Sequence, residues 1–299
     1  MIKRDEAYDV GFVSITGSVG KKLSILEPDF DCVVFVNVDV SKFDKVLEKY
    51  ENILKNSVIP MDGLRKTKHS LQFSIHGFNY DLLPATNFLI GQDFDNHDVI
   101  FRQRNITLRH IRKQLKRGKE SPQRSAYSSG LAHSNVHFMT RYRGFSHEIA
   151  RIARFWFKCL QLKVQPYGAK RLIEVVALHA AKKKKNHESA FRTFLGLMSK
   201  FNDLVINLHG VFPYPAAPYV SDLSNPLNNL AVNWDNDSIT LVKKYALSTL
   251  SEMDQKSPTA DAADFHFQKI VEELNDNLDP SIPYLEYKRD LKSLSFILI

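Results

Sequence analysis

Two aspartates separated by one residue, Asp29 and Asp31, lead directly into an apolar run, CVVFVNV, with the composition of a buried strand. In a strand, residues i and i+2 point to the same face, so both carboxylates converge while Phe30 faces the other way. Carboxylate oxygens are the ligands that hard divalent cations prefer. The pair therefore predicts a metal site at the edge of a sheet.

A third carboxylate, Asp81, lies in the strand-like run FNYDLLPA. A neighbouring strand can bring this side chain beside the first two, where we expect it to act as metal ligand and general base. Two Mg²⁺ ions held by such carboxylates can activate an attacking hydroxyl and neutralise a leaving pyrophosphate. We therefore expect two Mg²⁺ ions, with Mn²⁺ as a substitute, bound by Asp29, Asp31 and Asp81.

A glycine-containing turn, TGSVGK from Thr16 to Lys21, follows a strand-like segment, and ten residues separate Ser18 from Asp29. The N–H groups and the hydroxyl of such a turn can cradle a triphosphate. Taken singly, each of these segments is equally well explained as an ordinary surface turn. Their order and spacing together favour a site that brings nucleotide phosphates to metal ions.

The elements that must position these residues change in character along the chain. Alternating apolar residues predict strands at 10–15, 32–38, 71–75 and 78–83, and helical spacing predicts a helix over 41–55. Later, apolar residues three and four apart predict helices at 147–163, 168–184, 189–208, 238–253 and 265–278. This is an α+β pattern, a small mixed sheet followed by a helical lobe, and it suits a nucleotide-binding cleft.

The predicted domains are a catalytic lobe over 1–145, a helical lobe over 146–255 and a C-terminal extension over 256–299. The Ser/Gly-rich stretch 125–130 is the candidate hinge. Forty-one Lys and Arg against 33 Asp and Glu give a net charge of +8, which attracts polyanions, and nine of these cations fall within 101–124. Charge alone names no partner.

The two cysteines, Cys32 and Cys159, form no CxxC pair, which favours a reducing compartment and disfavours a zinc ribbon. The N-terminus lacks the apolar core of a signal peptide, and no apolar stretch is long enough to span a membrane. We therefore expect no membrane contact and a cytoplasmic protein, with the nucleus as a second location.

These segments together resemble the 2′-5′-oligoadenylate synthetase family of the DNA polymerase β-like nucleotidyltransferase superfamily, which also contains cGAS-like enzymes. GSVGK looks like the family's phosphate loop, DFDCVVFV like its metal strand and YDLLPA like its third-carboxylate segment. IARIARFWF at 149–157 resembles its helix with two basic nucleotide contacts, and RLIEVVALHA, AFRTFL and DLSNPLNN follow in the family's order. The resemblance covers about residues 10–250.

The resemblance implies a bilobal enzyme, with a mixed, mainly antiparallel sheet lobe and a helical lobe, that joins ATP into 2′-5′-linked oligoadenylates without a template. It implies a role in RNA sensing and antiviral innate immunity. Asp29, Asp31 and Asp81 are carried over as the catalytic, metal-binding residues. The ATP contacts carried over are Gly17, Ser18, Lys21, Arg151, Arg154, Lys170 and Arg171.

Four of these contacts lie in the helical lobe. Arg151 and Arg154 are three residues apart, hence on one helix face, and should grip the triphosphate, although an ordinary solvated helix face is the alternative. Lys170 takes the place of a polar nucleotide contact, and Arg171 stands where the family often has an adenine-stacking aromatic residue. A guanidinium can also stack on a purine, so we expect looser base preference.

Two other functions stay open: a cGAS-like cyclic dinucleotide synthase of the same fold, and a catalytically inactive RNA-binding homologue. The three carboxylates and the Gly-Ser turn disfavour the inactive homologue. We expect a monomer that binds ATP, other NTPs and double-stranded RNA. The phosphate turn begins at Gly17, which leaves little room for the family's long N-terminal helix, so we expect RNA to activate the protein weakly or not at all.

Overall fold

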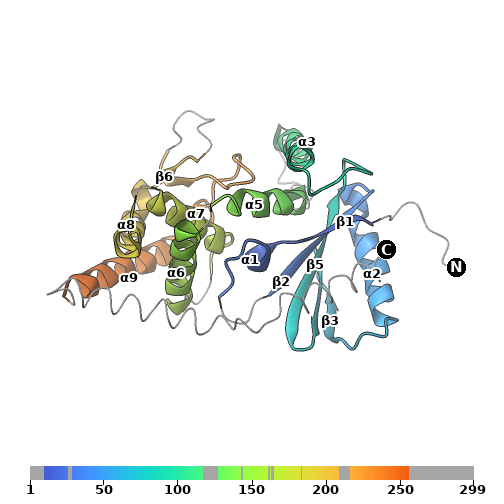
Figure 1. Cartoon of the computed structure of the whole chain (residues 1–299), viewed down its shortest axis with the longest axis horizontal. Coiled ribbons are helices and arrows are strands. Elements are labelled where there is room, and N and C mark those ends of the chain that lie inside the picture. The colour runs from blue at the N-terminus through green and yellow to red at the C-terminus, as the bar shows by residue number, and fades with distance from the viewer. Residues whose placement is uncertain are drawn as a thin grey trace. The chain divides into compact units, whose positions relative to one another are not determined.

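The computed structural model describes residues 10–25, 29–116, 127–142, 144–160, 162, 165–182, 184–208 and 216–255. These residues form two compact units, the first ending at Thr140 and the second beginning at Arg141 (Figure 1). The hinge expected at 125–130 does not mark this division, because residues 127–131 are helical and belong to the first unit. The expected extension 256–299, with its helix at 265–278, lies outside the described residues.

The first unit is built on a five-stranded sheet in the order β1-β2-β5-β4-β3. Strands β2 and β5 are parallel, and every other neighbouring pair is antiparallel. The mixed, mainly antiparallel sheet that the resemblance implied is thus confirmed. The strands are β1 (Val10–Ile15), β2 (Phe30–Val36), β3 (Asp62–Lys66), β4 (Leu71–Ile75) and β5 (Phe78–Thr86).

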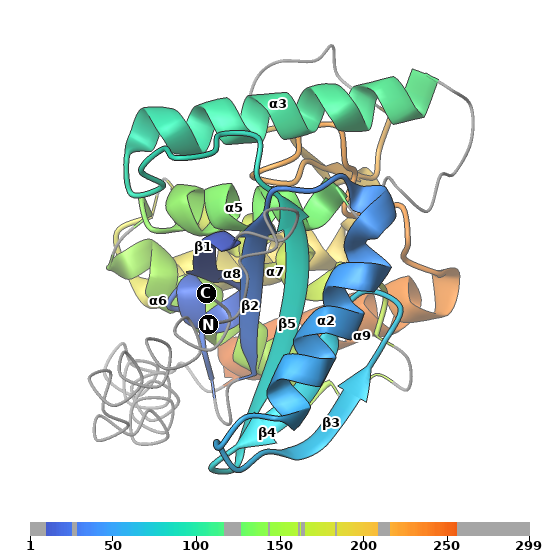
Figure 2. The same cartoon turned by 90° about the vertical axis from the view of Figure 1, so that its right-hand side faces the viewer.

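Helices cover both faces of this sheet (Figure 2). Helix α2 (Phe43–Lys55) packs on one face through apolar residues spaced three and four apart, among them Val46, Tyr50 and Leu54. Helices α3 (His97–Lys116) and α5 (Ala132–Met139) pack on the other face. There a buried cluster joins the sheet to α3 through Val33, Phe35, Ala85, Leu89, Phe94 and Val99.

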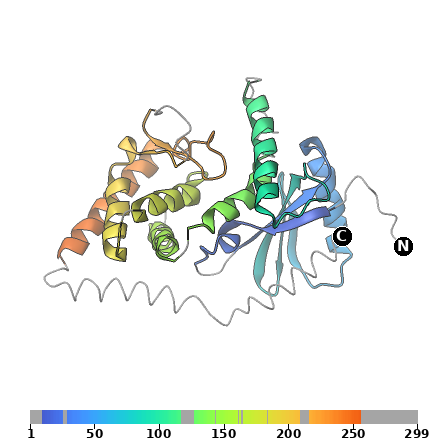
Figure 3. The same ribbon diagram turned by 45° about the horizontal axis from the view of Figure 1, so that its top comes forward.

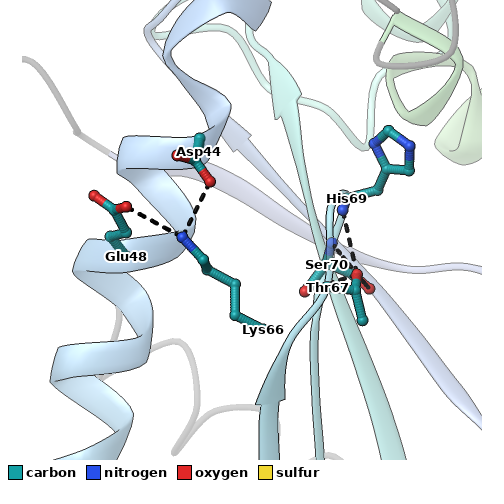
Figure 4. A network of polar contacts seen from close by, with 6 residues as sticks. All are labelled: Asp44, Glu48, Lys66, Thr67, His69 and Ser70. Atoms are coloured by element: carbon teal, nitrogen blue, oxygen red, sulfur yellow. Dashed lines mark hydrogen bonds and ion pairs between the residues drawn. The ribbon is translucent and has the colours of Figure 1, made fainter.

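A polar network attaches α2 to the edge strand β3 (Figure 4). The Lys66 ammonium donates to the carboxylates of Asp44, at 3.0 Å, and Glu48, at 3.1 Å, on α2. These hydrogen bonds raise the pKa of Lys66, but both carboxylates are exposed and such contacts orient more than they stabilise. Because side chains alternate along a strand, Arg65 belongs to the opposite face, away from α2.

The second unit is helical (Figure 3), as predicted. Its core helix α7 buries residues on nearly all sides and packs between α6 and α8, while α9 packs on α8. Within the part of the chain that the structure describes, no helix has the length and apolar character needed to cross a bilayer. The elements are α6 (Phe145–Cys159), α7 (Ala169–Ala181), α8 (His187–Ser199), β6 (Val205–Ile206), β7 (Tyr219–Val220) and α9 (Asn236–Gln255).

Candidate active site

Asp31 and Asp81 are direct cross-strand partners on the parallel strands β2 and β5. Neighbouring strands lie about 4.8 Å apart, so the two carboxylates leave the same face of the sheet side by side. One carboxylate oxygen, Oδ1 of Asp81, is buried and has no hydrogen-bond partner in the part of the chain that the structure describes. An unpaired buried carboxylate oxygen is unfavourable. The two residues therefore fit a site for a divalent cation.

The short helix α1 (Gly17–Gly20) brings the glycine turn directly against Asp31. The N–H and the hydroxyl of Thr16 donate to the carbonyl oxygen of Asp31 at 2.7 and 3.1 Å. Gly17 has a φ of +58°, and a Cβ there would collide with Oδ2 of Asp31. Glycine is therefore required by both the backbone conformation and the close approach. Ser18 is half-buried in this turn, and Lys21, at its end, is buried.

Asp29 precedes β2 and is exposed. Its Oδ1 accepts a hydrogen bond from Nδ2 of Asn79 at 3.4 Å. No three His, Cys, Asp or Glu side chains among the described residues are grouped closely enough to hold a metal ion. The structure thus brings Asp31 and Asp81 together, and the role of Asp29 as a third ligand stays a prediction.

The negative charge of the paired aspartates affects the pKa of the neighbouring Cys32 thiol. Burial, together with the negative charges of Asp31 and Asp81, raises the pKa of Cys32 to about 12. Cys32 is therefore a protonated, unreactive thiol at neutral pH. The same negative field favours a cation near the two carboxylates.

Arg151 and Arg154, the predicted triphosphate contacts, lie on α6 in the second unit and have different surroundings. Arg154 forms an ion pair with Glu174 of α7 at 3.1 Å, and the two side chains are only 10% and 4% exposed. Arg151 is half-buried, burial lowers the pKa of its guanidinium, and its buried Nη2 has no hydrogen-bond partner among the described residues. The role of Arg151 as a triphosphate contact stays a prediction.

Lys170 and Arg171, the two positions that depart from the family pattern, are exposed in the first turn of α7. Arg171 pairs with the buried carboxylate of Asp222 at 3.3 Å. The other oxygen of Asp222 accepts from the backbone N–H of Ser224 at 2.8 Å. Burial alone would raise the pKa of Asp222, but Arg171 and the hydrogen bonds from Ser224 hold it below its ordinary value. Asp222 therefore orients Arg171.

Three partners of the predicted site residues were not singled out from the sequence: Asn79 in the first unit, and Glu174 and Asp222 in the second. Glu174 is an isolated carboxylate in the apolar helix RLIEVVALHA, which is a usable signal for a buried ion pair. Asp222 precedes Ser224 by two residues, the spacing of a side chain that accepts from the backbone of a turn. Asn79 carries no comparable local signal, because its contact depends on strand register.

No protein-family model and no curated protein matches this chain. Several solved structures are similar. E. coli CdnC, determined with ATP, is 15% identical, with 88% of this chain and 83% of that chain covered and a TM-score of 0.53. The Bradyrhizobium diazoefficiens CD-NTase CdnG, in complex with GTP, is 10% identical, with 89% and 85% covered and a TM-score of 0.52.

A cytoplasmic RNA terminal U-transferase is 9% identical, with 84% of this chain and 82% of that chain covered and a TM-score of 0.54. At such identities the likeness shows the fold alone. The chain has the α+β fold of polymerase β-like nucleotidyltransferases, as expected. None of these three structures is an oligoadenylate synthetase, so the narrower family stays a prediction.

Proposed function

We propose that this protein is a template-independent nucleotidyltransferase that makes 2′-5′-linked oligoadenylates from ATP. The observation that carries the proposal is the in-register pairing of Asp31 with Asp81 beside the glycine turn at Gly17. Nucleotidyl transfer needs carboxylates for cations and N–H donors for phosphates, and this face of the sheet carries both. The 2′-5′ linkage rests on the sequence resemblance.

Asp31 and Asp81, with Asp29, would hold two divalent cations. Bound Mg²⁺ or Mn²⁺ would supply charge neutralisation of the triphosphate and a more acidic attacking hydroxyl. The N–H groups of the turn and the Ser18 hydroxyl bind phosphate oxygens, and the buried ammonium of Lys21 adds positive charge at the end of the turn. The sequence resemblance assigns a further triphosphate contact to Arg151 of α6.

The proposed enzyme has no strict preference for one base. The exposed Arg171 is paired with Asp222 and offers no aromatic ring for adenine. A guanidinium plane accepts any base that stacks on it. We therefore expect ATP to be used together with other NTPs at lower rates.

Product analysis tests the function. The protein is incubated with each NTP and with a mixture of all four, with Mg²⁺ or Mn²⁺, and Asp81→Asn protein is the matched control. We expect linear oligomers, identified by mass, that resist a nuclease specific for 3′-5′ bonds. Cyclic dinucleotides would instead establish a cGAS-like synthase. No product under any condition would favour an inactive homologue and overturn the proposal.

Arg151→Ala should reduce kcat/KM for ATP by about tenfold to a hundredfold, the equivalent of the ~1.5–3 kcal/mol of a hydrogen bond to a charged group. The Arg151 side chain is half-buried and its Nη2 is buried, so water screens its phosphate contact less than that of an exposed cation. Steady-state kinetics measure the change. Lys158→Ala, an exposed cation on the same helix, is the control. Equal kinetics for both variants would identify Arg151 as part of an ordinary solvated face.

We also propose that α3 binds double-stranded RNA. Exposed cations recur on it at spacings of three, four and seven residues and so form one stripe: Arg102, Arg109, Arg112, Lys113 and Lys116. The only acid in this helix is Asp98, in its first turn. The buried side of α3 holds Leu108 and Ile111, so the stripe faces solvent. Duplex RNA is recognised through its shape, phosphates and 2′-hydroxyls, which this surface suits.

RNA affinity should fall steeply with salt, because each phosphate contact releases counterions. Replacing Arg109 and Lys113 with Ala should weaken binding and make the slope of log K against log salt shallower by about 2. Filter binding or fluorescence anisotropy at several salt concentrations measures both. Lys42→Ala with Lys45→Ala, exposed cations at and near the start of α2, is the matched control. If the two double variants share one slope, RNA does not bind along this stripe.

A further inference from the structure

The hairpin that joins β4 to β5 holds its strands in a fixed register. Its two-residue turn, His76-Gly77, has positive φ at both positions, 50° and 81°, and Ile75 pairs directly with Phe78 across it. Such turns match the twist of the strands and set which residues lie opposite each other. Ser74 therefore faces Asn79.

A chain of hydrogen bonds leads from this hairpin to Asp29. The Ser74 hydroxyl donates to Oδ1 of Asn79 at 2.8 Å, and Nδ2 of Asn79 donates to Oδ1 of Asp29 at 3.4 Å. A flipped amide would place its oxygen against the carboxylate, so only this orientation suits Asp29. At 3.4 Å the second bond is longer than the usual N–H···O distance. It orients the exposed carboxylate more than it stabilises the fold.

Aromatic side chains on the reverse face hold the same strands together. Phe30 stacks on Tyr80 with ring centroids 5.1 Å apart, and Tyr80 stacks on Phe73 at 5.5 Å. Phe30 also meets the edge of Phe78 at 5.7 Å. Because Phe30 and Tyr80 alternate with the polar residues of β2 and β5, this ladder keeps Asp29 beside Asn79.

We infer that Asn79, held by Ser74, is a positioning residue that orients Asp29 as a ligand for a divalent cation. The inference rests on the proposed function, which makes Asp29 a member of the metal site. A neutral amide suits this task because it fixes the carboxylate without cancelling its charge. Residues that orient metal ligands typically change metal affinity by about tenfold to a hundredfold when they are replaced.

Mn²⁺ affinity of the full chain, measured by EPR titration, tests the inference without requiring turnover. We expect Asn79→Ala to weaken Mn²⁺ binding about tenfold. Ser74→Ala should weaken it in the same direction, whereas Ser74→Thr keeps the hydroxyl and should restore the affinity. In activity assays, the Mn²⁺ concentration for half-maximal rate should rise while the KM for ATP at saturating Mn²⁺ stays unchanged.

The Asp31→Asn variant distinguishes a failure of the positioning role from a failure of the proposed function. If Asp31→Asn weakens Mn²⁺ binding and the Asn79 and Ser74 variants do not, the positioning role is overturned and the proposed function stands. If the wild-type protein does not bind Mn²⁺, or Asp31→Asn leaves its affinity unchanged, both proposals are overturned. Thermal unfolding checks each variant, and if Asn79→Ala does not fold, the comparison of Ser74→Ala with Ser74→Thr decides.

Discussion

Asp81→Asn is expected to lower nucleotide transfer at least about a hundredfold while leaving the protein folded. The substitution keeps the shape of the side chain but removes one of the two paired charges proposed to hold the cations. Asp81 is the only acidic residue of β5, so no other carboxylate of this strand can replace it. Removing a single preorganised electrostatic contact already costs enzymes about a hundredfold to a thousandfold. Single-turnover and steady-state rates at saturating ATP and Mg²⁺ measure the loss.

The stability of Asp81→Asn should not fall. The Asp81 carboxylate lies beside Asp31, and its buried Oδ1 has no partner among the described residues, so the wild-type arrangement is unfavourable in the absence of a cation. Active sites commonly carry such a cost in stability. Asp62→Asn, an exposed aspartate on the edge strand β3, is the control and should retain full activity. Near-normal turnover by Asp81→Asn would show that Asp81 is not a ligand of the catalytic metal ions.

Arg154→Ala should lower the free energy of unfolding by about 3–5 kcal/mol, because it removes the guanidinium that contacts Glu174 at 3.1 Å while the Glu174 carboxylate stays buried. Urea denaturation followed by circular dichroism measures this change. Replacing Arg154 and Glu174 together with Leu should recover most of the loss, since buried ion pairs are often no more stabilising than apolar residues of similar volume. Because the Arg154→Ala variant is expected to be less stable, its ATP kinetics should be compared with those of the wild type at equal folded fractions.

Arg192→Ala supplies the matched control for this pair. Arg192 also bridges two helices, contacting Glu188 on α8 and Asp254 on α9, but the Asp254 side chain is 70% exposed. Ion pairs of this exposed kind contribute at most about 1 kcal/mol. If Arg154→Ala costs no more than Arg192→Ala, the Arg154–Glu174 pair does not hold α6 to α7 as the structure indicates.

Sequence patterns predicted most elements to within a few residues where one face is apolar and buried. Strands β1, β2, β4 and β5 and helices α2, α6 and α9 follow this rule, and α7, which is buried on nearly all sides, also matches its predicted range. The helix predicted over 189–208 is too long, because α8 ends at Ser199 and the chain continues into the short strand β6. The edge strand β3 was missed because its residues are mostly exposed and show no alternation. Helix α3 was missed as a helix because polar residues, Gln103, Thr107 and Gln114, occupy buried positions and obscure its period.

The candidate site, too, was only partly predictable from the sequence. That Asp29 and Asp31 belong to one face follows from the alternation of side chains in a strand, which is a local property. Which strand lies beside β2 is a non-local property, and β5, some fifty residues later, takes that place in the exact register that sets Asp81 against Asp31. Likewise, Arg154 meets Glu174 only because α6 packs on α7. Sequence spacing determined the residue types and their faces, whereas strand register and helix packing, which depend on contacts across the whole unit, decided their partners.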